Sequence, residues 1–464
     1  MTVKNRILTA AAVTLVLSSG ASPARAGKPT RKVFEPGLLW GVPASPEPAP
    51  VERDPWLPTG PALPSPIARP PAEAEPPACS DRVPVCVHRA AGVSDAAALT
   101  ALAALETAYV RLVVALRLPA PLPDRGLGGT DALDLYLSAR SAPLATGHDA
   151  PALIGFDAAP AFCALGDDTL IERDATLCVA EAITWRLAPA TTPFLRRAYA
   201  AHLWRAVGAP TSRDADALDL LQASPERGIA GGASNDLAEG AALFADYLEA
   251  HGDGAPGRLT TALVAAAATQ TPPRAFEWDD DPDLFDVLRH NFDGDTRRMA
   301  DMLGDFAVTR AFIGDRGDGS LLPELDFAGP FARVRFDWRV PLSSLPRNLA
   351  SVRPISPTGS IYLWVDIDRA SADRTFAFHA EWEPPVTFKW ILLKVGKGGE
   401  ELARYDVTFE DHATVAERRI SELEGAAGIL IVGTNLGGVD LLHPFDPDVA
   451  PYEPHACSVY LVML

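Results

Sequence analysis

The sequence predicts an α+β protein of several domains, in which a mostly helical domain precedes an antiparallel β-sandwich. The chain has 464 residues, of which 48 % are hydrophobic and 22 % charged, values that are typical of globular proteins with sizeable cores. Apolar residues recur mainly at helical spacing before residue 313 and mainly at every second position after residue 331. We therefore predict a signal peptide (1–26), a proline-rich linker (27–78), the helical domain (79–313), a short linker (314–330) and the sandwich (331–464).

The first 26 residues have the anatomy of a secretory signal peptide. Lys4 and Arg6 precede an apolar run at residues 7–17, and Ala24-Arg25-Ala26 is an A-x-A cleavage site before Gly27. The run has roughly half of the ~20 residues that a membrane span requires, and no later stretch is predicted to be a span. We expect the mature protein to be secreted, periplasmic or at the cell surface.

Residues 27–78 are dense in proline. Proline fixes φ and lacks an N–H group, so this segment is predicted to be an extended spacer rather than helix or sheet. A proline-rich ligand for another protein is an alternative. Its apolar residues, Phe34, Trp40 and Trp56 among them, could instead pack against the folded part of the chain.

Within the helical domain, Ser94 is a suitable N-cap for a helix whose apolar residues continue to Leu116. Alternation predicts a strand at 133–137, and a second short strand is expected at 152–156. Capping residues, proline and glycine predict the remaining helices at 176–187, 193–207, 236–250, 281–290 and 296–311.

The C-terminal part shows the two-residue period of half-buried strands, with turn residues between them. Eight short strands favour an antiparallel sandwich. They are predicted at 334–340, 360–366, 375–381, 386–395, 401–409, 415–423, 427–434 and 458–462.

The net charge of −19 disfavours nucleic acid and anionic membranes as partners, because both require a basic face. We expect an extracellular or envelope protein, or a glycan, as the partner.

The cysteine pattern agrees with an oxidising compartment. Proximity in the sequence suggests the pairs Cys79–Cys86 and Cys163–Cys178 and leaves Cys457 single. Other pairings remain open, since spacing alone does not decide among them.

Motifs for the common catalytic sites are absent from the sequence, including G-x-S-x-G, the Walker loop and H-E-x-x-H. The order of a long helix, two strands, a helix and further helices nevertheless resembles the catalytic domain of gluzincin-type zinc metallopeptidases. In that family the helix after the strands carries H-E-x-x-H, whose histidines bind zinc and whose glutamate polarises the bound water. In this chain Glu181 matches the glutamate, while Ala180 and Thr184 stand at the histidine positions.

The family's third zinc ligand is a glutamate on a later helix. Glu239 lies in a similar Glu-Gly-x-Ala run and would be that ligand. The nearer helix at 193–207 aligns equally well, and Arg197 would then replace the glutamate. Both alignments stay open.

The missing histidines imply a degenerate metallopeptidase-like protein without zinc, in which Glu181 and Glu239 are vestigial site residues. No cofactor is expected, and zinc would be bound only if this inactive interpretation is wrong. The predicted role is non-catalytic binding or scaffolding at the bacterial cell envelope or exterior. The alternatives are a secreted hydrolase that uses Glu181 and Glu239, and a carbohydrate- or protein-binding module in the sandwich. A further possibility is that Glu181 is only a solvated helix charge.

Overall fold

The computed structural model describes most of the chain after residue 75. The described residues are 65, 67–71, 76–149, 158–166, 171–229, 234–252, 255–267, 283–292, 296–313, 322, 325, 333–368, 373–384, 386–407, 413–438 and 454–464. The expected signal peptide, most of the proline-rich segment, the strand expected at 152–156 and nearly all of the linker at 314–330 lie outside them.

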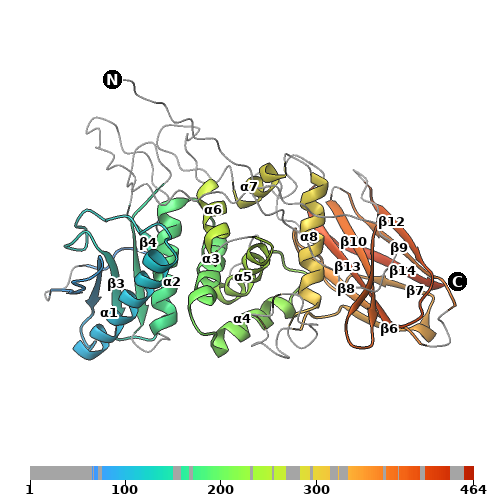
Figure 1. Ribbon diagram of the computed structural model, residues 1–464, viewed down its shortest axis with the longest axis horizontal. Coiled ribbons are helices and arrows are strands. Elements are labelled where there is room, and N and C mark those ends of the chain that lie inside the picture. The colour runs from blue at the N-terminus through green and yellow to red at the C-terminus, as the bar shows by residue number, and fades with distance from the viewer. Residues whose placement is uncertain are drawn as a thin grey trace, which may run out of the picture.

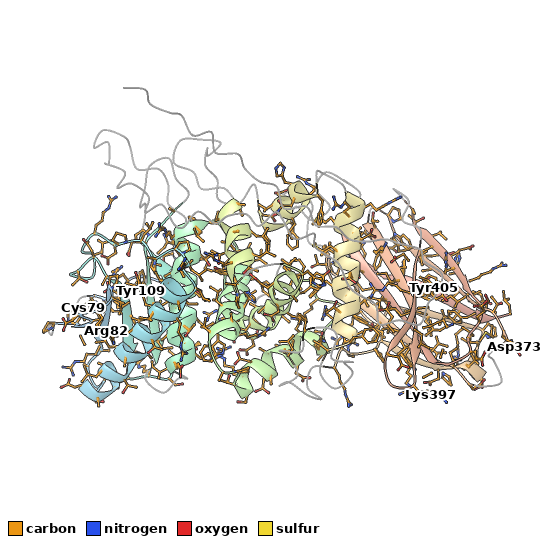
Figure 2. The ribbon with its side chains drawn as sticks, in the orientation of Figure 1. Cys79, Arg82, Tyr109, Asp373, Lys397 and Tyr405 are labelled. Atoms are coloured by element: carbon orange, nitrogen blue, oxygen red, sulfur yellow. A yellow bond between two sulfur atoms is a disulfide. The ribbon has the colours of Figure 1, made fainter. Side chains whose placement is uncertain are left out.

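The described parts form three bodies in a row, as Figure 1 shows: a sheet with two helices at one end, a group of helices in the middle, and a β-sandwich at the other end. This arrangement confirms an α+β architecture of several parts. Figure 2 shows the side chains of Cys79 and Arg82 at the outer end of the first sheet, that of Asp373 at the far end of the sandwich, and that of Lys397 at its lower edge.

The first sheet has the strand order β1-β2-β3-β5-β4. Its strands are β1 (Ala78–Cys79), β2 (Val85–Arg89), β3 (Leu133–Ser138), β4 (Ala145–His148) and β5 (Ala161–Gly166). The central strands β2, β3 and β5 run parallel, and β1 and β4 close the two edges in antiparallel orientation. Only β3 matches an expected strand. The four-residue β4, Ala-Thr-Gly-His, shows no apolar alternation that sequence reasoning could have detected.

One face of this sheet is covered by helices. Leu133, Leu135 and Leu137 of β3 belong to a core shared with α1 (Asp95–Tyr109) and α2 (Ile171–Leu187). The intervening residues of β3 point to the opposite face, as the pleat of a strand requires. The sheet therefore has one apolar face, packed against the helices, and an opposite face that carries polar and aromatic side chains.

Helix α1 begins as expected at Ser94, whose side-chain oxygen accepts a hydrogen bond from the N–H of Ala97 at 3.2 Å. It continues through a π-helical segment, Val110–Ala115. By length and composition alone, the stretch Asp95–Ala115 could cross a membrane. In the fold it contributes Leu105 and Leu112 to the apolar core.

The central helices are α3 (Pro193–Val207), α4 (Ser212–Ala223), α5 (Asn235–Ala250), α6 (Arg258–Ala266), α7 (Leu284–Asn291) and α8 (Thr296–Ala311). The bounds of α3 and α8 are those predicted, and α5 begins one residue earlier than expected. Helices α4 and α6 were not predicted. Helix α4 starts at a capping box made by Thr211 and Asp214.

The sandwich consists of two sheets with the orders β11-β10-β13-β8-β6 and β12-β9-β14-β7. The strands are β6 (Trp338–Pro341), β7 (Arg347–Ala350), β8 (Ser360–Asp366), β9 (Phe376–Trp382), β10 (Val386–Gly396), β11 (Glu401–Asp406), β12 (Val415–Ile420), β13 (Ala426–Gly438) and β14 (Cys457–Met463). All eight expected strands are present; β8 has the predicted bounds, the other seven have shifted ends, and β7 is an additional strand. Apolar residues of the two inner faces form a common core.

Helix α8 joins the helical body to the sandwich (Figure 1). Val308 and Phe312 pack with Ile391 and Leu430 on the outer face of the five-stranded sheet. Lys389 of β10, only 4 % exposed, lies 2.6 Å from a carboxylate oxygen of Asp301 on α8. The sandwich is thus attached through a packed and charged interface.

A buried histidine links the central helices α3 and α5. Nδ1 of His202 on α3 lies 2.7 Å from Oδ1 of Asp246 on α5, and its Nε2 lies 3.7 Å from Glu249. Burial alone would lower the pKa of His202, but the hydrogen bonds and charges of these two carboxylates raise it to about 9. The histidine is therefore an imidazolium in the folded protein at neutral pH.

We predict that this imidazolium makes the stability of the protein depend on pH in the alkaline range. Its pKa in the folded state lies above the ordinary value of 6.5, so the contribution is complete below about pH 6.5 and is lost as the pH rises through about 9. The contribution is on the order of 2–3 kcal/mol. Urea unfolding between pH 6 and pH 10 measures it. The His202→Gln variant, which has no charge to lose, should show a flatter profile, and an unchanged slope would contradict the assignment.

Candidate functional site

Glu181 lies in the interior of the helical body. It sits on α2, most of whose side chains are buried, and is itself only 4 % exposed. Its Oε1 lies 2.7 Å from Nε of Arg197 on α3, and its Oε2 accepts a hydrogen bond from the Thr146 hydroxyl on β4. The interpretation of Glu181 as a solvated helix charge is therefore wrong.

Arg197 connects the two glutamates that the sequence singled out. Its Nη1 lies 3.8 Å from Oε1 of Glu239 on α5, while its Nε contacts Glu181. Its Nη2 donates a hydrogen bond of 2.9 Å to the carbonyl oxygen of Leu144, just before β4. The structure thus brings Glu181, Glu239 and Arg197 together, and a guanidinium lies within ion-pair distance of both carboxylates.

Glu239 is held by further arginines. Arg173 of α2 donates from Nη2 to Glu239 at 2.7 Å and to Asp214 at 2.9 Å, and Arg213 lies 3.3 Å from the other oxygen of Glu239. Burial alone would lower the pKa of Arg173, but Glu239 and Asp214 raise it above its usual value. Sequence reasoning missed Arg173 and Asp214, because nothing in the local pattern marks a buried charge on an otherwise ordinary helix.

The two histidine positions of the zinc motif lie in the packed interior. Ala180 is fully buried in the apolar core, and the hydroxyl of Thr184, also fully buried, donates to the carbonyl oxygen of Ala180 at 3.3 Å. Among the described residues, no group of three or more His, Cys, Asp or Glu side chains is arranged to hold a metal ion. These residues do not fit a zinc ion, since alanine supplies no ligand and the threonine hydroxyl is already engaged.

A disulfide sets the position of Glu181 relative to the sheet. Cys163 of β5 is bonded to Cys178 of α2 and is the cross-strand partner of Thr146 on β4. Cys178 precedes Glu181 by three residues, and residues at this spacing lie on the same side of a helix. The bond therefore holds the Thr146 hydroxyl beside the Glu181 carboxylate.

The cysteine predictions agree with the structure. Cys79 is bonded to Cys86 across the β1–β2 pair, and Cys163–Cys178 is the second predicted bond. Cys457 is free and buried, and burial raises the pKa of its thiol to about 12. Disulfides of this kind are typical of proteins from oxidising, extracellular compartments.

This arrangement restricts what the two glutamates can do chemically. Glu239 is 1 % exposed and Glu181 4 %, so neither carboxylate is offered to a substrate. Each is paired with at least one guanidinium, which does not give up its proton in proteins. The cluster is a buried ion-pair network that couples α2, α3 and α5 to the sheet.

A second group of polar side chains lies on the outer face of the four-stranded sheet, and sequence reasoning did not identify it. His379 of β9 lies 2.8 Å from carboxylate oxygens of both Glu381 and Glu417. The hydrogen bond with Glu381 makes the largest contribution to raising the pKa of His379. A shallow hollow of about 480 Å³ beside it is bordered by Arg418 and Tyr460.

Comparisons with known proteins identify no family. No family model matches the chain, and no curated protein sequence matches it. Among solved structures, it is similar to the pre-peptidase C-terminal domain of a collagenase from Bacillus anthracis, with 8 % identity, a TM-score of 0.17, and coverage of 28 % of this chain and 97 % of that chain. A similarity of this size supports no argument about fold or function.

We predict that Arg197→Ala destabilises the protein by about 3–5 kcal/mol, because it leaves Glu181 buried without its guanidinium. Arg213→Ala is the matched control: Arg213 also contacts Glu239, but its side chain is 30 % exposed. The control should cost only about 1 kcal/mol or less. Urea unfolding of both variants measures the difference. Adding Glu181→Gln to Arg197→Ala should recover part of the loss, and equal losses in the two single variants would contradict the proposed role of Arg197.

We also predict that removal of the Cys163–Cys178 bond destabilises the chain. The bond spans fifteen residues, which corresponds to about 3 kcal/mol in the chain-entropy model. Unfolding of Cys163→Ala/Cys178→Ala, compared with the wild type under non-reducing conditions, tests this. Peptide mapping that finds both thiols free in the wild-type protein would contradict the bond itself.

Proposed function

We propose that the protein is a secreted, non-catalytic binding or scaffold protein of the bacterial cell envelope or exterior. In this proposal its helical body is a metallopeptidase-like framework that has lost its zinc centre. The observation that carries the proposal is Arg197, which lies within ion-pair distance of both Glu181 and Glu239.

The order of elements is consistent with the proposed resemblance. The long helix α1 precedes the strands β3 to β5, and the buried helix α2 follows them directly. Position 197, one of the two open alternatives for the third ligand, contacts Glu181 directly. An arginine there supplies a permanent positive charge where the family would hold an exchangeable cation.

The substitution of a guanidinium for a metal separates stability from catalysis. Both cations can neutralise buried carboxylates, but only a metal ion lowers the pKa of a bound water enough to generate hydroxide near pH 7. Without a metal-bound water, Glu181 has no water proton to accept and cannot act as the general base. The alternative of a hydrolase that uses Glu181 and Glu239 is disfavoured by the burial of both carboxylates.

Secretion is supported by two independent features. The leader-like residues 1–26 predict export, and the two disulfides suit an oxidising compartment. The sandwich offers a second candidate function, as a carbohydrate- or protein-binding module. The hollow beside His379, with the aromatic ring of Tyr460 and the charge of Arg418, favours it.

The non-catalytic proposal predicts that purified wild-type protein contains no stoichiometric zinc and cleaves no peptide in a chelator-sensitive way. Plasma emission spectrometry and a peptide library measure the two properties. The variant Ala180→His/Thr184→His/Arg197→Glu would place three zinc ligands at the family's positions and should gain zinc. The same two histidines with Arg197 retained are the control, and should bind zinc more weakly because the guanidinium repels the metal.

The outcomes separate the two parts of the proposal. Stoichiometric zinc together with chelator-sensitive cleavage in the wild type contradicts the non-catalytic role. A folded triple variant that binds no zinc contradicts the metallopeptidase-like framework, while leaving the non-catalytic role in place.

A further inference from the structure

The face of the first sheet that the helices leave uncovered carries polar and aromatic side chains. Asp134 and Tyr136 alternate along β3 with the leucines of the core, and Phe162 of β5 and His88 of β2 are their neighbours on adjacent strands. Asp134 is fully buried, and its Oδ1 lies 2.9 Å from Nε2 of His88. A carboxylate in such a place requires a cationic partner.

That partner is Arg69, from the end of the proline-rich segment. Its Nη1 donates to Asp134 and, at 3.1 Å, to the hydroxyl of Tyr136. Its Nε donates at 3.0 Å to Asp149, which follows β4, and its Nη2 contacts Asp149 and lies 3.0 Å from Asp124. Three carboxylates thus surround a single guanidinium.

The pocket also fits the flat shape of a guanidinium. The central carbon of the Arg69 guanidinium lies 4.8 Å from the ring centroid of Phe162, within the range of a cation–π contact. The carboxylates lie around the donors of the group, which is the planar fork geometry that arginine offers and lysine does not. The site is therefore built for arginine rather than for a cation in general.

The charge of the pocket exceeds what Arg69 supplies. Burial raises the pKa of Asp124, and the neighbouring charge of Asp134 raises it further, while Arg69 acts in the opposite direction. With Arg69 removed, the three carboxylates would repel one another in a poorly solvated site. A guanidinium from any polypeptide would therefore stabilise these carboxylates.

The segment that supplies Arg69 is attached mainly by side chains. Ser65 accepts a hydrogen bond from the N–H of His148 at 3.1 Å, and Ile67 lies against Gly147 so closely that an added Cβ would approach it to 2.9 Å. Among the described residues, no backbone-to-backbone hydrogen bond joins residues 65–71 to the sheet. Pro70 and Pro71, which follow Arg69, have no N–H to donate.

We propose that this pocket is an arginine-recognition site, occupied within the chain by Arg69, which accepts the arginine of another extended, proline-flanked polypeptide when residues 65–71 are displaced. The site lies on the face of the sheet opposite α2, so it is separate from the Glu181 network. The inference extends the binding role proposed above by naming the chemistry of the partner. Its test does not involve zinc, so its failure is distinguishable from a failure of that proposal.

The test uses the full chain and a capped synthetic peptide of residues 65–71, Ser-Pro-Ile-Ala-Arg-Pro-Pro, in calorimetric titrations. The Arg69→Ala variant has an open pocket and should bind this peptide at least about tenfold more tightly than the wild type, whose own segment competes at high effective concentration. The wild type should still bind it saturably at millimolar peptide. A peptide with lysine in place of arginine should bind Arg69→Ala at least about tenfold more weakly.

Two further variants locate the binding. Arg69→Ala/Asp134→Asn should lose most of the affinity, because Asp134 is the most deeply buried carboxylate of the pocket. Arg82→Ala is the matched control: Arg82 is exposed at the outer end of the same sheet, and its loss should leave the wild-type behaviour unchanged (Figure 2).

The remaining outcomes of these titrations each support or overturn the proposed arginine-recognition site. If Arg69→Ala does not fold alone, the peptide should restore its near-ultraviolet circular dichroism, and a failure to do so overturns the proposal. A folded Arg69→Ala variant that does not bind the peptide shows that Arg69 is a structural clamp only. Equal binding of the lysine peptide, undiminished binding after Asp134→Asn, or no binding to the wild type at millimolar peptide would also overturn it.

Discussion

The burial of α2 from Arg173 to Trp185 is the constraint on which the rest of the helical body depends. Every residue of this stretch is buried, yet it carries Arg173, Asp174 and Glu181. A charge in such a place costs several kcal/mol unless a partner of opposite sign lies beside it. Each of these charged side chains therefore requires a partner on a neighbouring element, and those partners determine how α3, α4 and α5 are arranged around α2.

Neutralising buried carboxylates does not require catalytic chemistry. A zinc centre satisfies them with an exchangeable ion that also activates water, whereas Arg197 satisfies them with a cation bonded to the chain. Because the guanidinium belongs to a residue of α3, folding of the chain places it beside the carboxylates, and no metal ion has to be bound. The Cys163–Cys178 bond adds to this effect, since it holds the Thr146 hydroxyl on the other side of Glu181. Such a centre stabilises the framework and leaves other surfaces to carry the function.

The sequence was informative where local chemistry decides the structure. Thr192, Pro193 and Gly208 define the two ends of α3, and alternation found the strands of the sandwich, because both signals act within a few residues. The sequence was uninformative where contacts between distant residues determine the structure. The start of α2 was placed five residues late, since the buried Arg173 and Asp174 resemble ordinary surface residues of a helix. The choice between Glu239 and Arg197 could not be made from the sequence either, because they lie on different helices and only the tertiary fold brings them within 3.8 Å of each other.

Arg197 and Arg69 each place a guanidinium among buried carboxylates, but with different consequences. Arg197 is buried on α3, whose own hydrogen bonds hold its backbone beside Glu181. Arg69 projects from a segment flanked by prolines and anchored by side chains, so it can leave Asp134 while the sheet stays folded. An ion pair is permanent or exchangeable according to the cooperativity of the backbone that carries it. This difference in attachment, more than the strength of either contact, separates the structural centre of the protein from its proposed recognition site.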